Sequence, residues 1–151
     1  MHTVLFVCTA NICRSPMAMG LLRKKVGQSV GWRIESAGTW SILGEPPAWN
    51  TQLVLDQRGI NVRDHRSRPV HLELLREFML ILVMEAGHKE ALQVEFPEIA
   101  DRVHLVSEMI GATYNIPDPM GNSFESFEET AKEFEQILDQ GFEKISQLAE
   151  D

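Results

Sequence analysis

Residues 8–15 place several groups suited to phosphate chemistry in one short segment. Arg14 follows Cys8 by six residues, and Ser15 comes directly after it. A cysteine thiolate is a strong nucleophile, and a guanidinium offers a planar fork that holds two phosphate oxygens at once. The backbone N–H groups of such a loop can converge on one anion, helped by the positive end of a following helix. The segment therefore predicts a phosphate-binding loop with Cys8 as nucleophile, lined by Thr9, Ala10, Asn11, Ile12, Cys13, Arg14 and Ser15.

Two other residues of the segment support this interpretation. The Ser15 hydroxyl can donate a hydrogen bond to a thiolate, and Asn11 suits a left-handed position in a tight loop. A lone cysteine after an apolar run is more often a small buried hydrophobic residue. The complete Cys-x5-Arg-Ser pattern, placed between a predicted strand and a predicted helix, outweighs that alternative.

The order of the predicted elements gives the fold class. Residues 4–8 are typical of a strand buried on both faces, and Ser15-Pro16 predicts a helix start with Ser15 as the N-cap. Further strands are predicted at 33–37, 78–83 and 102–106, and helices at 48–58, at 87–94 and from 123 onward as one long helix. This alternation predicts a single domain over 1–151, a flavodoxin-like three-layer α/β/α fold with a four-stranded parallel sheet. Ligands of such sheets bind beyond the carboxyl ends of the strands, where the 8–15 segment falls.

The composition narrows the function classes. The chain has 151 residues and only two cysteines, Cys8 and Cys13, which excludes a disulfide framework and a four-cysteine zinc site. The net charge of −8 argues against a nucleic-acid partner. The longest apolar run, Phe78–Met84, is too short to insert into a membrane, and the N-terminal residues lack a signal-peptide pattern. We therefore expect a cytoplasmic protein with reduced thiols.

The charge is divided unevenly along the chain. Residues 1–75 carry nine basic and five acidic side chains, whereas residues 76–151 carry five basic and seventeen acidic ones. This asymmetry either marks an anion site in the first half or reflects a solvated acidic helix at the C-terminal end.

Several segments together resemble the low-molecular-weight protein tyrosine phosphatase family in its bacterial form. The stretch from Val7 to Ala18 is similar to the family's nucleophile motif. The match continues in family order through Ser36-Ala37-Gly38-Thr39, Gly44-Glu45-Pro46-Pro47, Asp64-His65-Arg66-Ser67-Arg68, Leu82-Val83-Met84-Glu85 and Ile116-Pro117-Asp118-Pro119. The resemblance covers nearly the whole chain. It implies a hydrolase that removes phosphate from phosphotyrosine and aryl phosphates.

Asp118 is the general acid that the resemblance implies. Taken alone, an aspartate between two prolines is more often an ordinary turn residue. In the family, the matching carboxyl group protonates the leaving oxygen and later activates water, while the cysteine carries the phosphoryl group as a cysteinyl-phosphate. The resemblance also assigns Ser36 and His65 hydrogen bonds that brace the loop. It implies no cofactor and no metal, and the five histidines show no metal-binding spacing.

Three departures from the family pattern bear on the pocket. Ala10 stands where relatives often have glycine, and a positive φ there would cost on the order of 1 kcal/mol. Met120 follows the Asp118-Pro119 pair at a position where many relatives carry tyrosine. Trp40 can supply an aromatic wall from the opposite loop, with a half-buried packing role as the equal alternative.

Three rival activities differ in the residues they need. Arsenate-reducing relatives depend on later cysteines, and none follows Cys13 in this chain. Arginine phosphatases tend to carry threonine where Ile12 stands, so Ile12 favours phosphotyrosine. A thiol redox module could use a Cys8–Cys13 disulfide, but it needs neither Arg14 nor Asp118. The expected partner is a phosphotyrosine-bearing protein, with a bacterial tyrosine kinase as one candidate, while the physiological substrate and the oligomeric state stay open.

Overall fold

Four parallel strands form the centre of the computed structural model, which describes residues 1–151. The strands are β1 (His2–Cys8), β2 (Trp32–Gly38), β3 (Leu80–Val83) and β4 (Val103–Leu105), and they lie in the order β2-β1-β3-β4. The helices are α1 (Arg14–Val26), α2 (Trp49–Asp56), α3 (Leu72–Arg76), α4 (Ala86–Glu95), α5 (Phe124–Gln140) and α6 (Phe142–Ala149), with two short 3₁₀ segments at Pro97–Arg102 and Val106–Ile110. The predicted parallel four-stranded sheet is confirmed.

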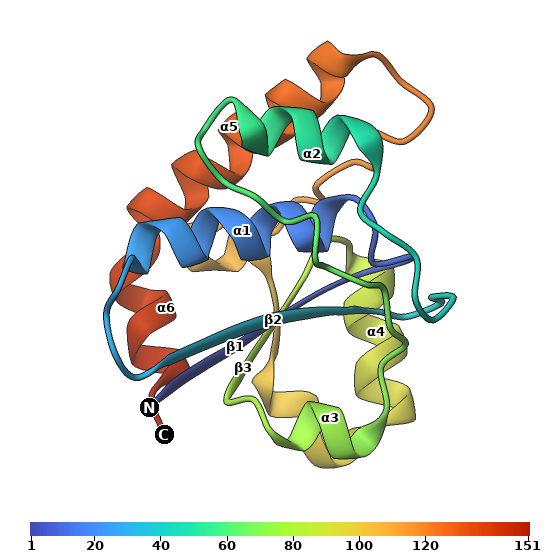
Figure 1. Ribbon diagram of the computed structural model, residues 1–151. Coiled ribbons are helices and arrows are strands. Elements are labelled where there is room, and N and C mark those ends of the chain that lie inside the picture. Colours follow the sequence, from blue (N-terminus) through green and yellow to red (C-terminus); the bar gives the residue numbers. More distant parts are fainter.

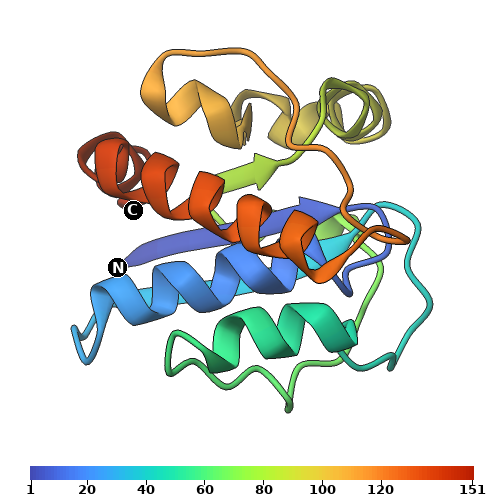
Figure 2. The same ribbon diagram turned by 90° about the horizontal axis from the view of Figure 1, so that it is seen from above.

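Helices cover both faces of the sheet (Figure 1), which confirms the three-layer prediction. Helices α1, α2, α5 and α6 pack on one face, and α3 and α4 pack on the other. Figure 2 shows α1 and α5 side by side on the same face of the sheet. None of these helices combines the length and apolar character needed to span a bilayer.

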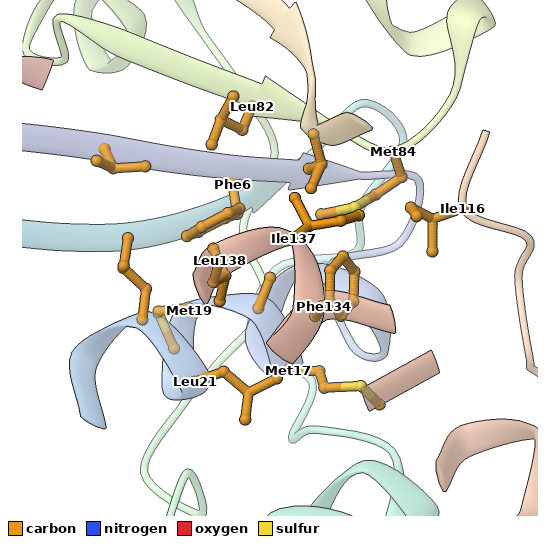
Figure 3. Close-up of a cluster of buried hydrophobic side chains, with 14 of the residues drawn as sticks. Phe6, Met17, Met19, Leu21, Leu82, Met84, Ile116, Phe134, Ile137 and Leu138 are labelled. Carbon is orange, nitrogen blue, oxygen red and sulfur yellow. The ribbon is translucent and has the colours of Figure 1, made fainter. Parts of the chain in front are cut away.

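The central strand β1 supplies both cores. Because side chains alternate across a strand, Phe6 faces α1 and α5, while Leu5 and Val7 face α3 and α4. Figure 3 shows the larger core, where Phe6 and Leu82 lie over Met17 and Phe134. A strand that is apolar on both faces fits only in the interior of a sheet that helices cover on both sides. This packing holds β1 in place and so fixes where Cys8, its last residue, lies.

The C-terminal segment differs from the single helix predicted for it. The apolar stripe is continuous, but the backbone turns at Gly141 between α5 and α6. A Cβ atom at Gly141 would lie 2.8 Å from the carbonyl oxygens of both Ile137 and Met109, so this turn requires glycine. The prediction also lacked α3 and the 3₁₀ segments, which are too short to give a periodic pattern.

Helix α1 begins two residues earlier than predicted. Arg14 is its first residue and Cys13 its N-cap, so the assignment of Ser15 as the N-cap was wrong. The Cys13 side chain makes no capping hydrogen bond. The first-turn amides of α1 are therefore not capped by a side chain, which is the arrangement that an anion site at a helix N-terminus requires.

The outer edge of β2 is closed by arginine side chains. Arg23 donates to the Ile34 carbonyl oxygen from Nε (2.9 Å) and Nη2 (2.5 Å), and Arg68 Nε donates to the Ser36 carbonyl oxygen at 3.0 Å. The end of the strand is paired through its backbone, since Gly38 N donates to the Arg68 carbonyl oxygen at 2.9 Å. The segment around Arg68 is thus fastened to β2 beside the 8–15 loop.

Gly38 ends β2 where the strand comes closest to the 8–15 loop. A Cβ atom built on it would lie 2.4 Å from the Thr9 carbonyl oxygen and 3.1 Å from the Asn11 Cβ. Neither neighbour is the end of a flexible side chain, so only glycine allows this approach.

We expect Gly38→Ala to lower the free energy of unfolding by about 1–3 kcal/mol, because the new methyl group must displace loop backbone. Urea unfolding measures this change. Gly87→Ala is the matched control, since its added methyl group meets no atom within 4 Å and the residue is helical. Equal stabilities of the two variants would contradict the close approach at Gly38.

Candidate active site

The thiol of Cys8 lies at the carboxyl end of β1, under the turn that leads into α1. Its Sγ atom is 3.0 Å from Ser15 Oγ, and both residues are buried. The loop therefore brings together Cys8 and Ser15, seven residues apart in sequence, as expected from the pattern.

Asn11 fixes the conformation of the loop. It is the only non-glycine residue with a positive φ, at 62°, and it is completely buried. This confirms the left-handed position predicted for Asn11. Ala10 does not have a positive φ, so the conformational penalty considered for its departure from glycine does not arise.

The hydrogen bonds of the Asn11 amide set the direction of the Ser15–Cys8 contact. The backbone N–H of Arg68 donates to Asn11 Oδ1 at 3.1 Å, so the amide NH₂ group must be the donor to Ser15 Oγ (2.7 Å) and Ser36 Oγ (3.0 Å). Because Ser15 Oγ accepts this hydrogen bond, its own hydrogen is free to point at Cys8 Sγ. Ser15 is therefore placed to donate to the sulfur whenever Cys8 is a thiolate, which can only accept.

His65 and Ser36 brace the loop from behind, in the place the resemblance implied. His65 Nε2 lies 2.7 Å from the Asn11 carbonyl oxygen, which can only accept, so Nε2–H is the donor. Burial lowers the pKa of His65. Arg68, which sequence reasoning did not select, joins them through its backbone N–H. Its signal was its place in the Asp64–Arg68 segment, three residues after the predicted support His65.

Arg14 is oriented by two acceptors on other segments. Its Nη1 donates to Glu85 Oε2 at 2.6 Å and to the Ile116 carbonyl oxygen at 2.7 Å, and only 2% of the side chain is exposed. Its Nε and Nη2 make no hydrogen bond to the protein, which leaves one edge of the guanidinium for a ligand. Glu85 was missed as a site residue, although an acidic residue directly after the apolar run that ends at Met84 is a signal for this edge of the sheet.

Asp118 lies on the loop between Ile116 and Met120. Ile116 anchors this loop, because its N–H donates to the Met84 carbonyl oxygen at 2.8 Å while its own carbonyl meets Arg14. The Asp118 side chain is exposed, and its Oδ1 accepts from Met120 N at 3.0 Å. Arg14 therefore connects the Asp118 loop to the Cys8–Ser15 loop.

Trp40 lies on the loop that follows β2, and 86% of it is exposed, so the half-buried alternative was wrong. This loop is hydrogen-bonded to the Cys8–Ser15 loop, here called the thiol loop, since Trp40 N donates to the Thr9 carbonyl oxygen at 2.9 Å. Ile12 is half-buried, and its carbonyl accepts from Ala48 N at 2.7 Å. Met120 is 45% exposed. Apolar side chains on the loops joined to the site are thus accessible from solvent.

Cys13 differs from Cys8 in its surroundings. Both thiols are buried in the larger core, but only Cys8 has the Ser15 hydroxyl beside its sulfur, and burial raises the pKa of Cys13 to about 12. The two cysteines are free thiols in this structure. Cys13 therefore stays protonated at neutral pH.

Two hollows lie near the Cys8–Ser15 loop and the Asp118 loop, and neither region holds a metal-binding cluster. No group of three His, Cys, Asp or Glu side chains gathers where it could hold a metal ion. One hollow, of about 800 Å³, lies behind the 8–15 loop and is lined by Ser36, His65 and Arg68 among others, but not by Cys8. A second, of about 370 Å³, lies between the Asp118 loop and α5.

Residues 3–150 match the family described as low molecular weight phosphotyrosine protein phosphatase. The chain belongs to this family. The low-molecular-weight tyrosine phosphatases are enzymes with the same sheet and helix layers, so the resemblance seen in the sequence is confirmed over nearly the whole chain.

Relatives of this phosphatase carry two kinds of name. A protein-arginine-phosphatase of Geobacillus stearothermophilus is 34% identical, with 95% of this chain and 96% of that protein covered. A probable low molecular weight protein-tyrosine-phosphatase, EpsP, of Ralstonia nicotianae is 32% identical, with 97% of each covered. The solved structure of a low molecular weight protein tyrosine phosphatase from T. tengcongensis is 36% identical, with a TM-score of 0.89 and with 95% of this chain and 99% of that chain covered.

We expect iodoacetate at neutral pH to modify Cys8 and to leave Cys13 unmodified in the native phosphatase. The reagent is an anion that reacts with thiolates; both cysteines are buried to a similar degree, so the raised pKa of Cys13 is what protects it. Peptide mass mapping measures the sites. Cys13→Ser should react like the wild type and Cys8→Ser should not react, whereas native labelling of Cys13 would contradict the contrast between the two thiols.

Proposed function

We propose that this phosphatase hydrolyses phosphotyrosine in proteins through a cysteinyl-phosphate, with Cys8 as nucleophile and Asp118 as general acid and base. The observation that carries the proposal is the hydrogen-bonded chain from the Asn11 amide through Ser15 to Cys8 Sγ, together with Arg14, which Glu85 orients at the start of α1. A cysteine with a positioned hydroxyl donor and an adjacent guanidinium is suited to act as a thiolate on a bound phosphate.

In the first step, the Cys8 thiolate attacks phosphorus and the bond from phosphorus to the tyrosyl oxygen breaks. Asp118 transfers its proton to that oxygen, so the leaving group departs as neutral tyrosine. The free edge of Arg14 and the first-turn amides of α1 hold the equatorial oxygens, where negative charge is concentrated. One S–P bond forms as one P–O bond breaks.

In the second step, water attacks phosphorus and the S–P bond breaks. Asp118 now accepts the proton of that water, which restores its starting state. The departing sulfur leaves as a thiolate, and the Ser15 hydroxyl stabilises it with the hydrogen that Asn11 has oriented. Inorganic phosphate is released, and the cycle requires no metal and no cofactor.

The pocket walls favour a flat aromatic substrate group. Ile12, Trp40 and Met120 present apolar surface on segments that are hydrogen-bonded to the thiol loop or follow Asp118. Such side chains can enclose a phenyl ring. The substrate is thus a phosphotyrosine-bearing protein, for which a bacterial tyrosine kinase is one candidate. Residues 1–151 act as one phosphatase domain in the cytoplasm, where thiols stay reduced.

Phosphoarginine is the second candidate substrate, because relatives at 34% and 31% identity are named protein-arginine-phosphatases. The apolar Ile12 side chain argues against it, since a guanidinium needs hydrogen-bond acceptors that an isoleucine does not offer. Arsenate reduction is disfavoured because no third cysteine exists to carry the disulfide.

A comparison of phosphotyrosine, phosphoserine and phosphoarginine peptides of one sequence tests the proposal. We expect kcat/KM to be highest for phosphotyrosine, and Cys8→Ser to abolish release of phosphate. Arsenate with a thiol reductant is the fourth substrate in the panel. A preference for phosphoarginine, or turnover by the Cys8→Ser variant, would overturn the proposal.

The role of Asp118 is tested by its dependence on the leaving group. We expect Asp118→Ala to lower kcat about a hundredfold or more for phosphotyrosine, because the leaving oxygen then departs without a proton. The loss should be much smaller for para-nitrophenyl phosphate, whose leaving group is stable as an anion. Asp101→Ala is the control, because Asp101 is an exposed aspartate in the 3₁₀ segment Pro97–Arg102, outside the Asp118 loop. Equal losses on both substrates would rule out an acid role.

A further inference from the structure

His88 is a buried histidine that none of the roles above uses. It lies in the first turn of α4 and is 7% exposed. Its Nε2 is 2.9 Å from Thr9 Oγ1, and its Nδ1 is 3.2 Å from the backbone N of Glu85. One imidazole thus contacts the residue after the Cys8 thiol and the residue that holds Arg14.

These two contacts determine where the ring proton lies. The backbone N–H of Glu85 can only donate, so His88 Nδ1 must carry a lone pair. The neutral ring then has its proton on Nε2 and donates it to Thr9 Oγ1. The Thr9 hydroxyl hydrogen is consequently free to point away from His88.

The charges around His88 come from three segments. Burial lowers its pKa, and so does Arg14 on α1, whereas Glu85 on its own turn and Asp118 on the opposite loop raise it. A protonated ring would place Nδ1–H against the Glu85 N–H, so that two donors would meet. The pair of contacts therefore exists only with the neutral ring.

We propose that His88 is a positioning residue for the phosphatase reaction, tying Thr9 to the turn from which Glu85 orients Arg14. The two sides of the phosphate site come from different segments, the thiol loop after β1 and the turn after β3. His88 makes the only side-chain hydrogen bond of Thr9, so it sets the distance between them. This inference rests on the proposed function, because it concerns the same site.

The geometry matters because transfer of a phosphoryl group is sensitive to small displacements. A shift of about 1 Å in a positioned group can cost on the order of a hundredfold in rate. Glu85 is 37% exposed and holds Arg14 at 2.6 Å, so its own placement depends on the turn that His88 stabilises. Loss of the His88 contacts should therefore reduce kcat more than it raises KM.

Two amide variants separate the contacts of His88. In His88→Asn, Oδ1 replaces Nδ1 and keeps the acceptor for Glu85 N–H, but the contact with Thr9 is lost. In His88→Gln, the side-chain NH₂ group replaces Nε2–H and keeps the donor to Thr9, but the acceptor for Glu85 is lost. Thr9→Val removes the hydroxyl without changing the fold of the chain, and His104→Asn is the control at a histidine on β4.

With para-nitrophenyl phosphate, we expect His88→Asn and Thr9→Val each to lower kcat about tenfold or more, with a smaller change in KM. The double variant should be no slower than either single variant, because both remove one hydrogen bond. His88→Gln should unfold at lower urea concentration than His88→Asn. His104→Asn should keep the wild-type kcat. Wild-type kcat in both Thr9→Val and His88→Asn, or losses that multiply in the double variant, would overturn the proposal.

Two further measurements separate positioning from a purely structural role. As the pH falls, protonation of His88 should reduce kcat, and this step should disappear in His88→Asn, which does not titrate. The ring ¹⁵N shifts of the resting enzyme should show an unprotonated Nδ1 and a protonated Nε2. These ¹⁵N shifts are measured without substrate. A proton found on Nδ1 and not on Nε2 would therefore count against the His88 inference alone. Failure on phosphotyrosine with intact turnover of the aryl phosphate counts against the proposed substrate alone.

Discussion

The carboxamide of Asn11 uses its oxygen and both of its amide hydrogens while the residue is wholly excluded from solvent. Leaving one of these groups without a partner inside the protein costs about 1–3 kcal/mol, so the bonds are kept or lost together. They join α1 through Ser15, β2 through Ser36 and the following segment through Arg68. The thiol of Cys8 owes its hydroxyl donor to this arrangement, since Ser15 is oriented by the amide. The loop is thus ordered before any phosphate arrives.

The site gathers one fixed positive charge and surrounds it with neutral donors. Arg14 is that charge, and Glu85 holds it on one edge only. His65 and His88 are both buried histidines with lowered pKa values, and each contributes a neutral N–H to the loop. An anion bound at the N-terminus of α1 would therefore meet the Arg14 guanidinium and these neutral donors. In this way a chain of net charge −8 can offer the phosphate site that we propose.

The sequence was most informative where a pattern is local. The apolar run of β1, the spacing from Cys8 to Arg14 and the left-handed Asn11 are all short-range signals, and the sheet they implied is present. The partners across the fold carried no such signal, because Glu85 meets Arg14 only after two strands pair in parallel. The break at Gly141 was hidden for a related reason, as the apolar stripe continues through it. The assignment of Ser15 as an N-cap was wrong because its hydroxyl serves the thiol instead.

The closed edge of β2 has a consequence for whether two copies of this chain can pair through their edge strands. An outer strand with free carbonyl groups is a template for strand addition, the first step in many aggregation and domain-exchange processes. Along β2, the carbonyls of Ile34 and Ser36 are taken by Arg23 and Arg68, and Gly38 is already paired. A strand from another molecule would have to displace two cationic side chains before it could bind. The segment that orders the Asn11 network thereby also protects this edge from intermolecular β-pairing.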